Sequence, residues 1–197
     1  MSSSPQPVAD LLADLARGLG ELGVRWFVFG AQAAILHGSA RLSADVDVTV
    51  DLGTRSSRTL VDALSREGFE LRVADAQGFV EATSVIPLLH VSSRMPLDIV
   101  LAGPGLEEQF FARATERRVG DTLVPVVAAE DLVAMKILAG RPRDVEDVAS
   151  ILRARRDLDV EAIRGTLRLL ERALDRADLV AELERVISRA GHIWRAE

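Results

Sequence analysis

The sequence contains no cysteine among its 197 residues. Disulfide scaffolds, zinc–thiolate sites and thiol catalysis are therefore excluded. Lysine is almost as scarce, because Lys136 is the only lysine among 24 basic residues. A bias in genome composition is the simplest explanation for the many arginines. A single lysine kept against that bias makes Lys136 a candidate functional residue.

Long apolar runs and a strong excess of positive charge are also missing. No apolar stretch approaches the roughly 20 residues that span a bilayer, and residues 1–7 lack the basic and apolar regions of a signal peptide. The net charge of −6 provides no general basic field, so contact with nucleic acid would need a local patch. We therefore expect a soluble cytoplasmic protein with no membrane partner.

Hydrophobic spacing predicts an α/β (α+β) fold: a mixed sheet with helices in residues 1–127, followed by a helical part in 128–197. The first part is predicted to hold helices at 8–22, 31–37 and 56–67 and strands at 26–29, 45–51, 69–73, 85–91, 97–101 and within 122–127. The second part is predicted to hold helices at 130–139, 143–155, 159–172 and 177–190. Trp194 is expected to pack on the body, since an exposed tryptophan is unusual.

The most informative segment is the strand predicted at 45–51, which reads DVDVTVD. Strict alternation places its valines on one face and Asp45 and Asp47 together on the other, about 7 Å apart along the strand. Two neighbouring carboxylates repel unless a proton or a cation lies between them. Oxygen ligands of this kind suit Mg²⁺, which substrate phosphates often complete. An ordinary solvated sheet face is the alternative reading.

A glycine after a strand, followed by D-x-D on the next strand, resembles the DNA polymerase beta-like nucleotidyltransferase superfamily. The chain is most similar to the minimal and abortive-infection-type nucleotidyltransferases, many of them toxins of bacterial toxin–antitoxin pairs. The resemblance covers roughly residues 22–155 and has two blocks. The first matches Gly30, Ala33, Arg41, Ser43, Asp45 and Asp47; the second matches Asp131, Lys136, Arg143, Asp144 and Asp147.

The resemblance implies a metal-dependent enzyme. Asp45, Asp47 and Asp98 would hold Mg²⁺ or Mn²⁺, and these three with Lys136 would be catalytic. The nucleoside triphosphate would be bound by Ala31 together with residues of both blocks, namely Gly30, Arg41, Ser43, Lys136 and Asp144. Ala31 departs from the family, where many active relatives have serine, so a hydroxyl toward the triphosphate is missing; Gln32 or Ser39 are candidates to replace it.

Structural alternatives exist for several of these residues. Asp98 can be an isolated acid at a strand edge, and Arg41 a surface residue paired with Asp45. Lys136 lies beside an apolar helical stripe, so it is expected to turn inward, with a snorkelling side chain as the alternative. Asp144 lies in the first turn of a helix, where an acid is favoured anyway, with Arg143 and Lys136 as expected partners.

The resulting hypothesis is transfer of a nucleoside monophosphate from a triphosphate to an acceptor hydroxyl, on tRNA or a protein, by a component of a toxin–antitoxin pair. A cognate antitoxin is the expected protein partner. Two alternatives stay open: a non-catalytic module that binds a nucleotide or partner, and a nucleotidyltransferase that modifies a small molecule such as an antibiotic.

Overall fold

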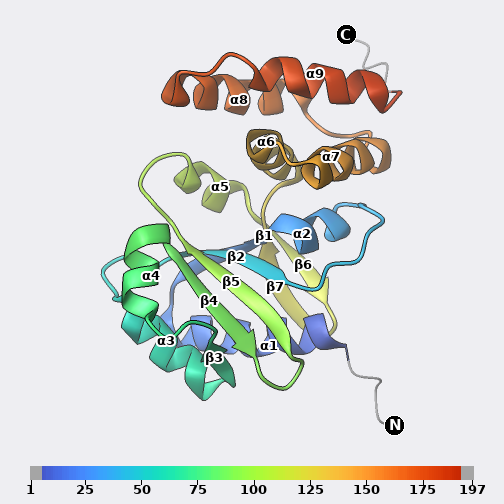
Figure 1. Ribbon diagram of the computed structural model, residues 1–197. Coiled ribbons are helices and arrows are strands. Elements are labelled where there is room, and N and C mark those ends of the chain that lie inside the picture. The colour runs from blue at the N-terminus through green and yellow to red at the C-terminus, as the bar shows by residue number, and fades with distance from the viewer. Residues whose placement is uncertain (1–5, 192–197) are drawn as a thin grey trace. The chain divides into compact units, whose positions relative to one another are not determined.

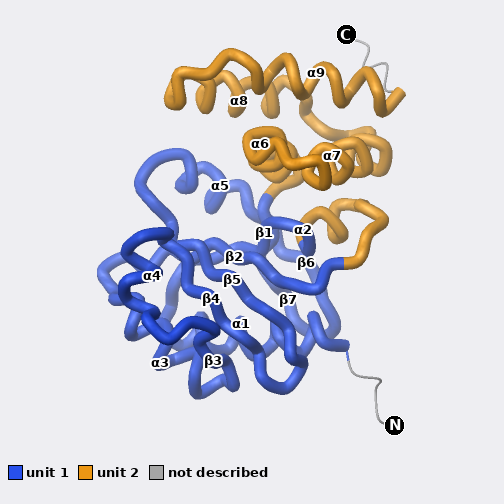
Figure 2. The backbone as a smooth tube through the Cα atoms, in the orientation of Figure 1, with its two compact units in different colours: residues 1–32, 43–127 blue, residues 33–42, 128–197 orange. Residues whose placement is uncertain are grey.

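The computed structural model describes residues 6–191, which group into two compact units (Figure 2). Among these residues, unit 1 comprises 6–32 and 43–127, and unit 2 comprises 33–42 and 128–191. The expectation for Trp194 lies outside the described residues.

Unit 1 is built on a seven-stranded mixed sheet with the strand order β3-β4-β5-β2-β1-β7-β6 (Figure 1). β2 pairs in parallel with β5, and β1 pairs in parallel with β7; the other neighbours are antiparallel. The strands are β1 (Arg25–Phe29), β2 (Val46–Asp51), β3 (Phe69–Leu71), β4 (Val85–His90), β5 (Met95–Leu101), β6 (Thr115–Val119) and β7 (Thr122–Val126). The predicted mixed α/β fold is confirmed.

The helices up to residue 127 are α1 (Pro7–Leu22), α2 (Gly30–Leu36), α3 (Ser57–Arg66), α4 (Ala76–Thr83) and α5 (Glu107–Arg113), and the last four residues of α2 group with unit 2. α1 and α3 cover this sheet because their apolar residues recur at helical spacing. They lie side by side on one face of the sheet (Figure 1). Four leucines of α1 are fully buried: Leu11, Leu12, Leu15 and Leu19. Val46, Val48 and Val50 of β2 are also fully buried, so the acidic residues of that strand belong to the opposite face.

Unit 2 is helical. It contains α6 (Ala129–Ala139), α7 (Pro142–Ala154), α8 (Val160–Leu174) and α9 (Leu179–Arg189). α6 packs against the other three, and apolar residues such as Leu132, Ile151 and Leu183 are completely buried. All four helices lie within two residues of the predicted positions. No helix of residues 6–191 is both long and apolar enough to cross a membrane.

Candidate active site

Two aspartates of unit 1 lie opposite each other on adjacent parallel strands. Asp47 of β2 is in register with Asp98 of β5. Register partners on neighbouring strands project to the same face of a sheet. The structure therefore brings together, on one face, two carboxylates that are 51 positions apart in the sequence.

The turn between β1 and α2 lies directly against Asp47 of this pair. Gly30 begins α2 in the left-handed region, at φ +64°. A Cβ atom at this position would overlap Asp47 Oδ2 and would lie 2.8 Å from Asp47 Cγ. Glycine is required here both by the backbone angle and by the carboxylate. Phe29, the residue before Gly30, is the register partner of Asp47. The turn that follows β1 therefore begins beside this aspartate.

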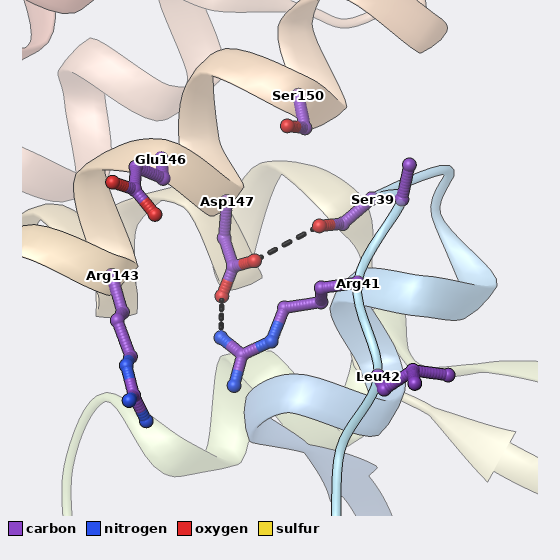
Figure 3. A pocket seen from close by; sticks show the side chains of 8 residues that line it. Ser39, Arg41, Leu42, Arg143, Glu146, Asp147 and Ser150 are labelled. Carbon is purple, nitrogen blue, oxygen red and sulfur yellow. Dashed lines mark hydrogen bonds and ion pairs between the residues drawn. The ribbon is translucent and has the colours of Figure 1, made fainter.

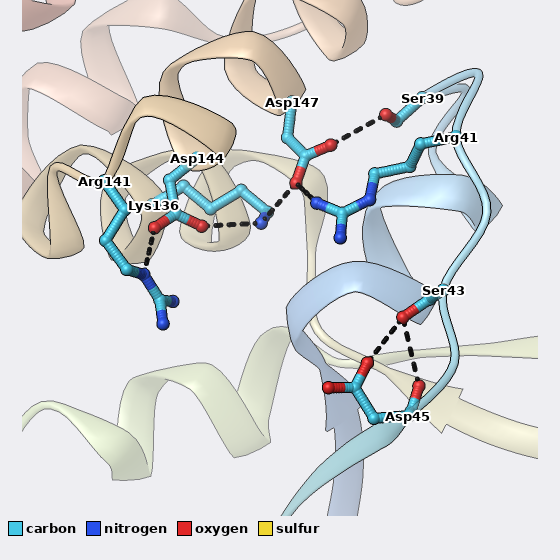
Figure 4. Close-up of polar contacts among 8 residues, drawn as sticks. All are labelled: Ser39, Arg41, Ser43, Asp45, Lys136, Arg141, Asp144 and Asp147. Carbon is cyan, nitrogen blue, oxygen red and sulfur yellow. Dashed lines mark hydrogen bonds and ion pairs between the residues drawn. The ribbon is translucent and has the colours of Figure 1, made fainter. Parts of the chain in front are cut away.

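Asp45 lies just before β2 and not in it, so the expected start of that strand is one residue too early. Its side chain is exposed and accepts a hydrogen bond from Ser43 Oγ at 2.6 Å (Figure 4). Its backbone carbonyl accepts from Gln32 Nε2 at 3.3 Å. Loop contacts rather than the strand pleat therefore position Asp45. Ala31 is buried at the start of α2.

Asp98 forms an ion pair with Arg72, which the sequence analysis did not identify. Arg72 follows β3 directly, and its Nε also donates to the carbonyl oxygen of Leu88 at 3.0 Å. Both side chains of the ion pair are about one-third exposed, at 35% for Arg72 and 36% for Asp98. The alternative of an isolated acid at a strand edge is wrong, because Asp98 lies in β5 between β4 and β2.

The donor chemistry of Asp47 and Asp98 fits a divalent cation that prefers oxygen, since the two carboxylates lie on adjacent strands and share one face of the sheet. The predicted third ligand, Asp45, is engaged by Ser43. Within residues 6–191, no three histidine, aspartate or glutamate side chains come together as a group that could hold a metal ion.

A second cluster of predicted residues lies in unit 2, around Lys136. Its side chain is 6% exposed, and its Nζ donates to Asp144 Oδ1 at 3.1 Å and to Asp147 Oδ2 at 2.7 Å (Figure 4). The inward orientation of Lys136 is confirmed, and the snorkelling alternative is wrong because the ammonium itself is buried. Asp144 pairs with Lys136 as expected, but its second partner is Arg141 and not Arg143.

The electrostatics of Asp144 follow from these contacts. Burial raises the pKa of the Asp144 carboxyl, but hydrogen bonds from Arg141 and Lys136 and their positive charges outweigh burial, so its pKa lies below the ordinary value. The carboxylate is thus ionised at neutral pH although it is almost completely buried.

Asp147 connects this cluster to the segment before β2. Its Oδ1 accepts from Ser39 Oγ at 2.9 Å, and its Oδ2 accepts from Arg41 Nη1 at 2.8 Å (Figure 3). Arg41 therefore pairs with Asp147, and the alternative of a salt bridge to Asp45 is wrong. A cavity of about 370 Å³ is lined by Ser39, Ala40, Arg41, Leu42, Arg143, Glu146, Asp147 and Ser150.

Solved structures similar to this chain share the nucleotidyltransferase fold. The antibiotic-resistance factor ANT(2″)-Ia is 16% identical with a TM-score of 0.59, covering 94% of this chain and 98% of its own. A nucleotidyltransferase-like antigen from Paracoccidioides brasiliensis is 17% identical with a TM-score of 0.53, covering 89% and 92%. The lincosamide antibiotic adenylyltransferase LnuA, bound to lincomycin, is 14% identical with a TM-score of 0.52, covering 74% and 96%.

The family model for the nucleotidyl transferase AbiEii toxin of type IV toxin–antitoxin systems matches residues 15–193. The chain therefore belongs to this family, which confirms the resemblance to the polymerase beta-like nucleotidyltransferases. No curated protein matches the sequence significantly.

Proposed function

We propose that this member of the AbiEii family transfers a nucleoside monophosphate from a nucleoside triphosphate to an acceptor hydroxyl. The observation that carries the proposal is the position of Asp47. It lies against the Gly30 turn and in register with Asp98, so the backbone of a tight turn and two carboxylates converge at one point. A turn without side chains lets a phosphate approach the backbone closely.

In the proposed reaction, the acceptor oxygen attacks the α-phosphorus and forms a new P–O bond. The bond between the α-phosphorus and the oxygen that bridges to the β-phosphate breaks, and pyrophosphate leaves. The proton of the acceptor hydroxyl passes to one of the aspartates, which acts as a general base. Asp45 is the most exposed of the three predicted carboxylates and needs only to release Ser43 for this role.

Asp47 and Asp98 would hold Mg²⁺ or Mn²⁺, with Asp45 as the predicted third ligand. A divalent cation bound there would neutralise charge on the phosphates and orient the attacking and leaving oxygens. Arg41, Ser43, Lys136 and Asp144 stay predictions as nucleotide-binding residues. Lys136, whose ammonium is held by two aspartates, would have to release one of them to reach a phosphate.

The toxin–antitoxin family supports an antitoxin as the partner, and its description names no acceptor. A protein hydroxyl is the acceptor that we propose, and the protein product of an adjacent antitoxin gene is the expected regulator. A tRNA acceptor stays a prediction that neither the family description nor the structures used above support. A small-molecule acceptor is the second candidate, because ANT(2″)-Ia and LnuA are named for antibiotics.

The test is nucleotidyl transfer by the purified chain. Nucleoside triphosphates labelled at the α-phosphate are incubated with Mg²⁺ or Mn²⁺ and, separately, with bacterial protein, tRNA or aminoglycosides. Asp47→Asn is expected to reduce transfer at least about 100-fold, since several kcal/mol of charge stabilisation are lost. Asp62→Asn, the same change at an exposed ion pair on α3, is the matched control and is expected to leave transfer unchanged.

Equal transfer by the Asp47→Asn and Asp62→Asn variants would contradict the proposed site. Binding of nucleotide that depends on Asp47, without transfer to any acceptor, would instead support the non-catalytic alternative, for which the missing hydroxyl at Ala31 is the structural reason.

A further inference from the structure

A row of register partners crosses the sheet of unit 1 at the proposed site. The register of β3 with β4 continues past Leu71, so that the backbone N–H of Arg72 donates to the carbonyl oxygen of Pro87 at 2.9 Å. Pro87 is in register with Asp98, and Asp98 with Asp47. Partners in such a row share one face, so Arg72 belongs to the same face as the two aspartates.

The guanidinium of Arg72 reaches Asp98 across an intervening strand. Two strand spacings separate their backbones, about 10 Å, and the side chain spans this distance by crossing β4 at Pro87. The hydrogen bond from Nε to the Leu88 carbonyl holds the side chain along this path, and Nη2 forms the ion pair with Asp98 Oδ1. Arg72 thus supplies positive charge to a carboxylate that is a predicted metal ligand.

We infer that Arg72 is a positioning residue that exchanges partners: it holds Asp98 while the site is empty and moves to a phosphate of the nucleotide when metal and nucleotide bind together. This inference rests on the proposed function. A guanidinium and a divalent cation repel each other when both approach the same carboxylate, so metal alone must compete with Arg72 for Asp98. A triphosphate relieves this competition because it offers the guanidinium acceptor oxygens of its own.

The exposure of the ion pair makes this exchange feasible. A pair that is about one-third exposed on both sides is held weakly, because water and salt screen it. The consequence is that metal and nucleotide bind with positive coupling: each binds more tightly when the other is present. Without Arg72, metal alone would bind more tightly and the coupling would decrease.

The test is calorimetric titration of the full chain with Mn²⁺ alone, and with α,β-methylene analogues of the four nucleoside triphosphates in the presence of Mn²⁺. Arg72→Gln is expected to bind Mn²⁺ alone about two- to fivefold more tightly, which is the range that a partly exposed ion pair contributes. The same variant is expected to bind the analogue with Mn²⁺ about tenfold more weakly, because a charge-assisted hydrogen bond to phosphate is lost. The opposite signs of these two changes identify the exchange.

Arg25→Gln is the matched control. Arg25 also lies in the sheet of unit 1 and forms ion pairs with Asp51 and Glu108, but neither is a predicted ligand, so both affinities are expected to stay unchanged. If Arg72→Gln does not fold, as judged by its melting temperature without metal, Arg72→Lys decides. Lysine has no counterpart of Arg72 Nε, which donates to the Leu88 carbonyl oxygen. Arg72→Lys is therefore expected to gain less Mn²⁺ affinity than Arg72→Gln.

Failure of this inference is distinguishable from failure of the proposed function. Mn²⁺ binding that is abolished by Asp47→Asn but is unchanged or weakened by Arg72→Gln would overturn the role of Arg72 and leave the metal site in place. Mn²⁺ binding that is unaffected by Asp47→Asn would overturn the site itself, and with it both proposals.

Discussion

Gly30 is the residue on which the geometry of the proposed site depends most. We expect Gly30→Ala to reduce the free energy of unfolding by about 1–2 kcal/mol for the left-handed backbone, and by a further 1–3 kcal/mol because the methyl group overlaps Asp47. Nucleotidyl transfer should fall in parallel, since Asp47 must move. Urea denaturation and the transfer assay measure the two effects.

Gly53 provides the matched control for this substitution. It has nearly the same left-handed angle, φ +56°, but a Cβ atom there would meet nothing within 4 Å. Gly53→Ala should therefore show the backbone cost alone and full transfer. Equal losses of stability and activity in the two variants would mean that the contact between residue 30 and Asp47 has no role.

At the residue scale, local sequence patterns predicted those parts of the candidate site that depend on neighbouring residues. Gly30 after a strand and the alternation around Asp47 were visible because both depend on neighbours in the chain. The ion pair of Asp98 with Arg72 was not, because it depends on the register of three strands that are distant in sequence. The only signal was an arginine within the predicted strand at 69–73, and such an arginine is too common to be informative.

The buried charges between α6 and α7 predict that a single substitution in unit 2 has a large effect on stability. Lys136→Met leaves Asp144 and Asp147 buried without their shared cation, so we expect it to reduce the free energy of unfolding by about 3–5 kcal/mol. Chemical denaturation measures this loss. A loss within about 0.5 kcal/mol would indicate an exposed lysine instead.

Arg17→Met serves as the surface control, because Arg17 also pairs with two acids but is mostly exposed; we expect a cost of at most about 1 kcal/mol. Adding Asp147→Asn to Lys136→Met should recover part of the loss, since one of the two buried negative charges that share Lys136 is removed. Nucleotide affinity of the same variants tests the separate prediction that Lys136 contacts the triphosphate.

Acid should destabilise this helix pair through Asp144. The pKa of Asp144 is lower in the folded chain than its ordinary value, so its contribution to stability is complete above the unfolded pKa of about 4 and is lost as the pH falls through the folded value. Asp144→Asn should therefore be less stable than the parent at pH 7, with the difference shrinking below pH 4. Denaturation midpoints between pH 3 and 7 measure it; a constant difference would contradict the ionised, paired state.

At the element scale, the helices of unit 2 were predicted because each has an apolar face of three or more residues. The helix α4, with no buried residue, and the short helix α5 were missed because neither has such a face. The strand β6 was missed because it reads TERRV, and a polar edge strand shows no alternation. The predicted strand at 69–73 is shorter in the structure, where β3 ends at Leu71.

At the scale of the whole molecule, the sequence predicted an α/β part and a helical part, and the domain boundary at 127/128 stays a prediction. Residues 33–42 group with the helical unit in the structure. The contacts responsible, such as those of Ser39 and Arg41 with Asp147, join positions more than 100 residues apart. No local pattern in residues 33–42 indicates them.

The burial of Lys136 has a consequence for the chemistry of the whole chain. It carries the only side-chain amine of the protein, and that amine is inside unit 2. Acylating reagents that modify lysine therefore have no reactive side chain on the described folded surface, and they reach Lys136 only when the helices around it separate. Acylation of this single position, followed by mass spectrometry of peptides cut after arginine, thus reports the opening of unit 2 without any introduced label.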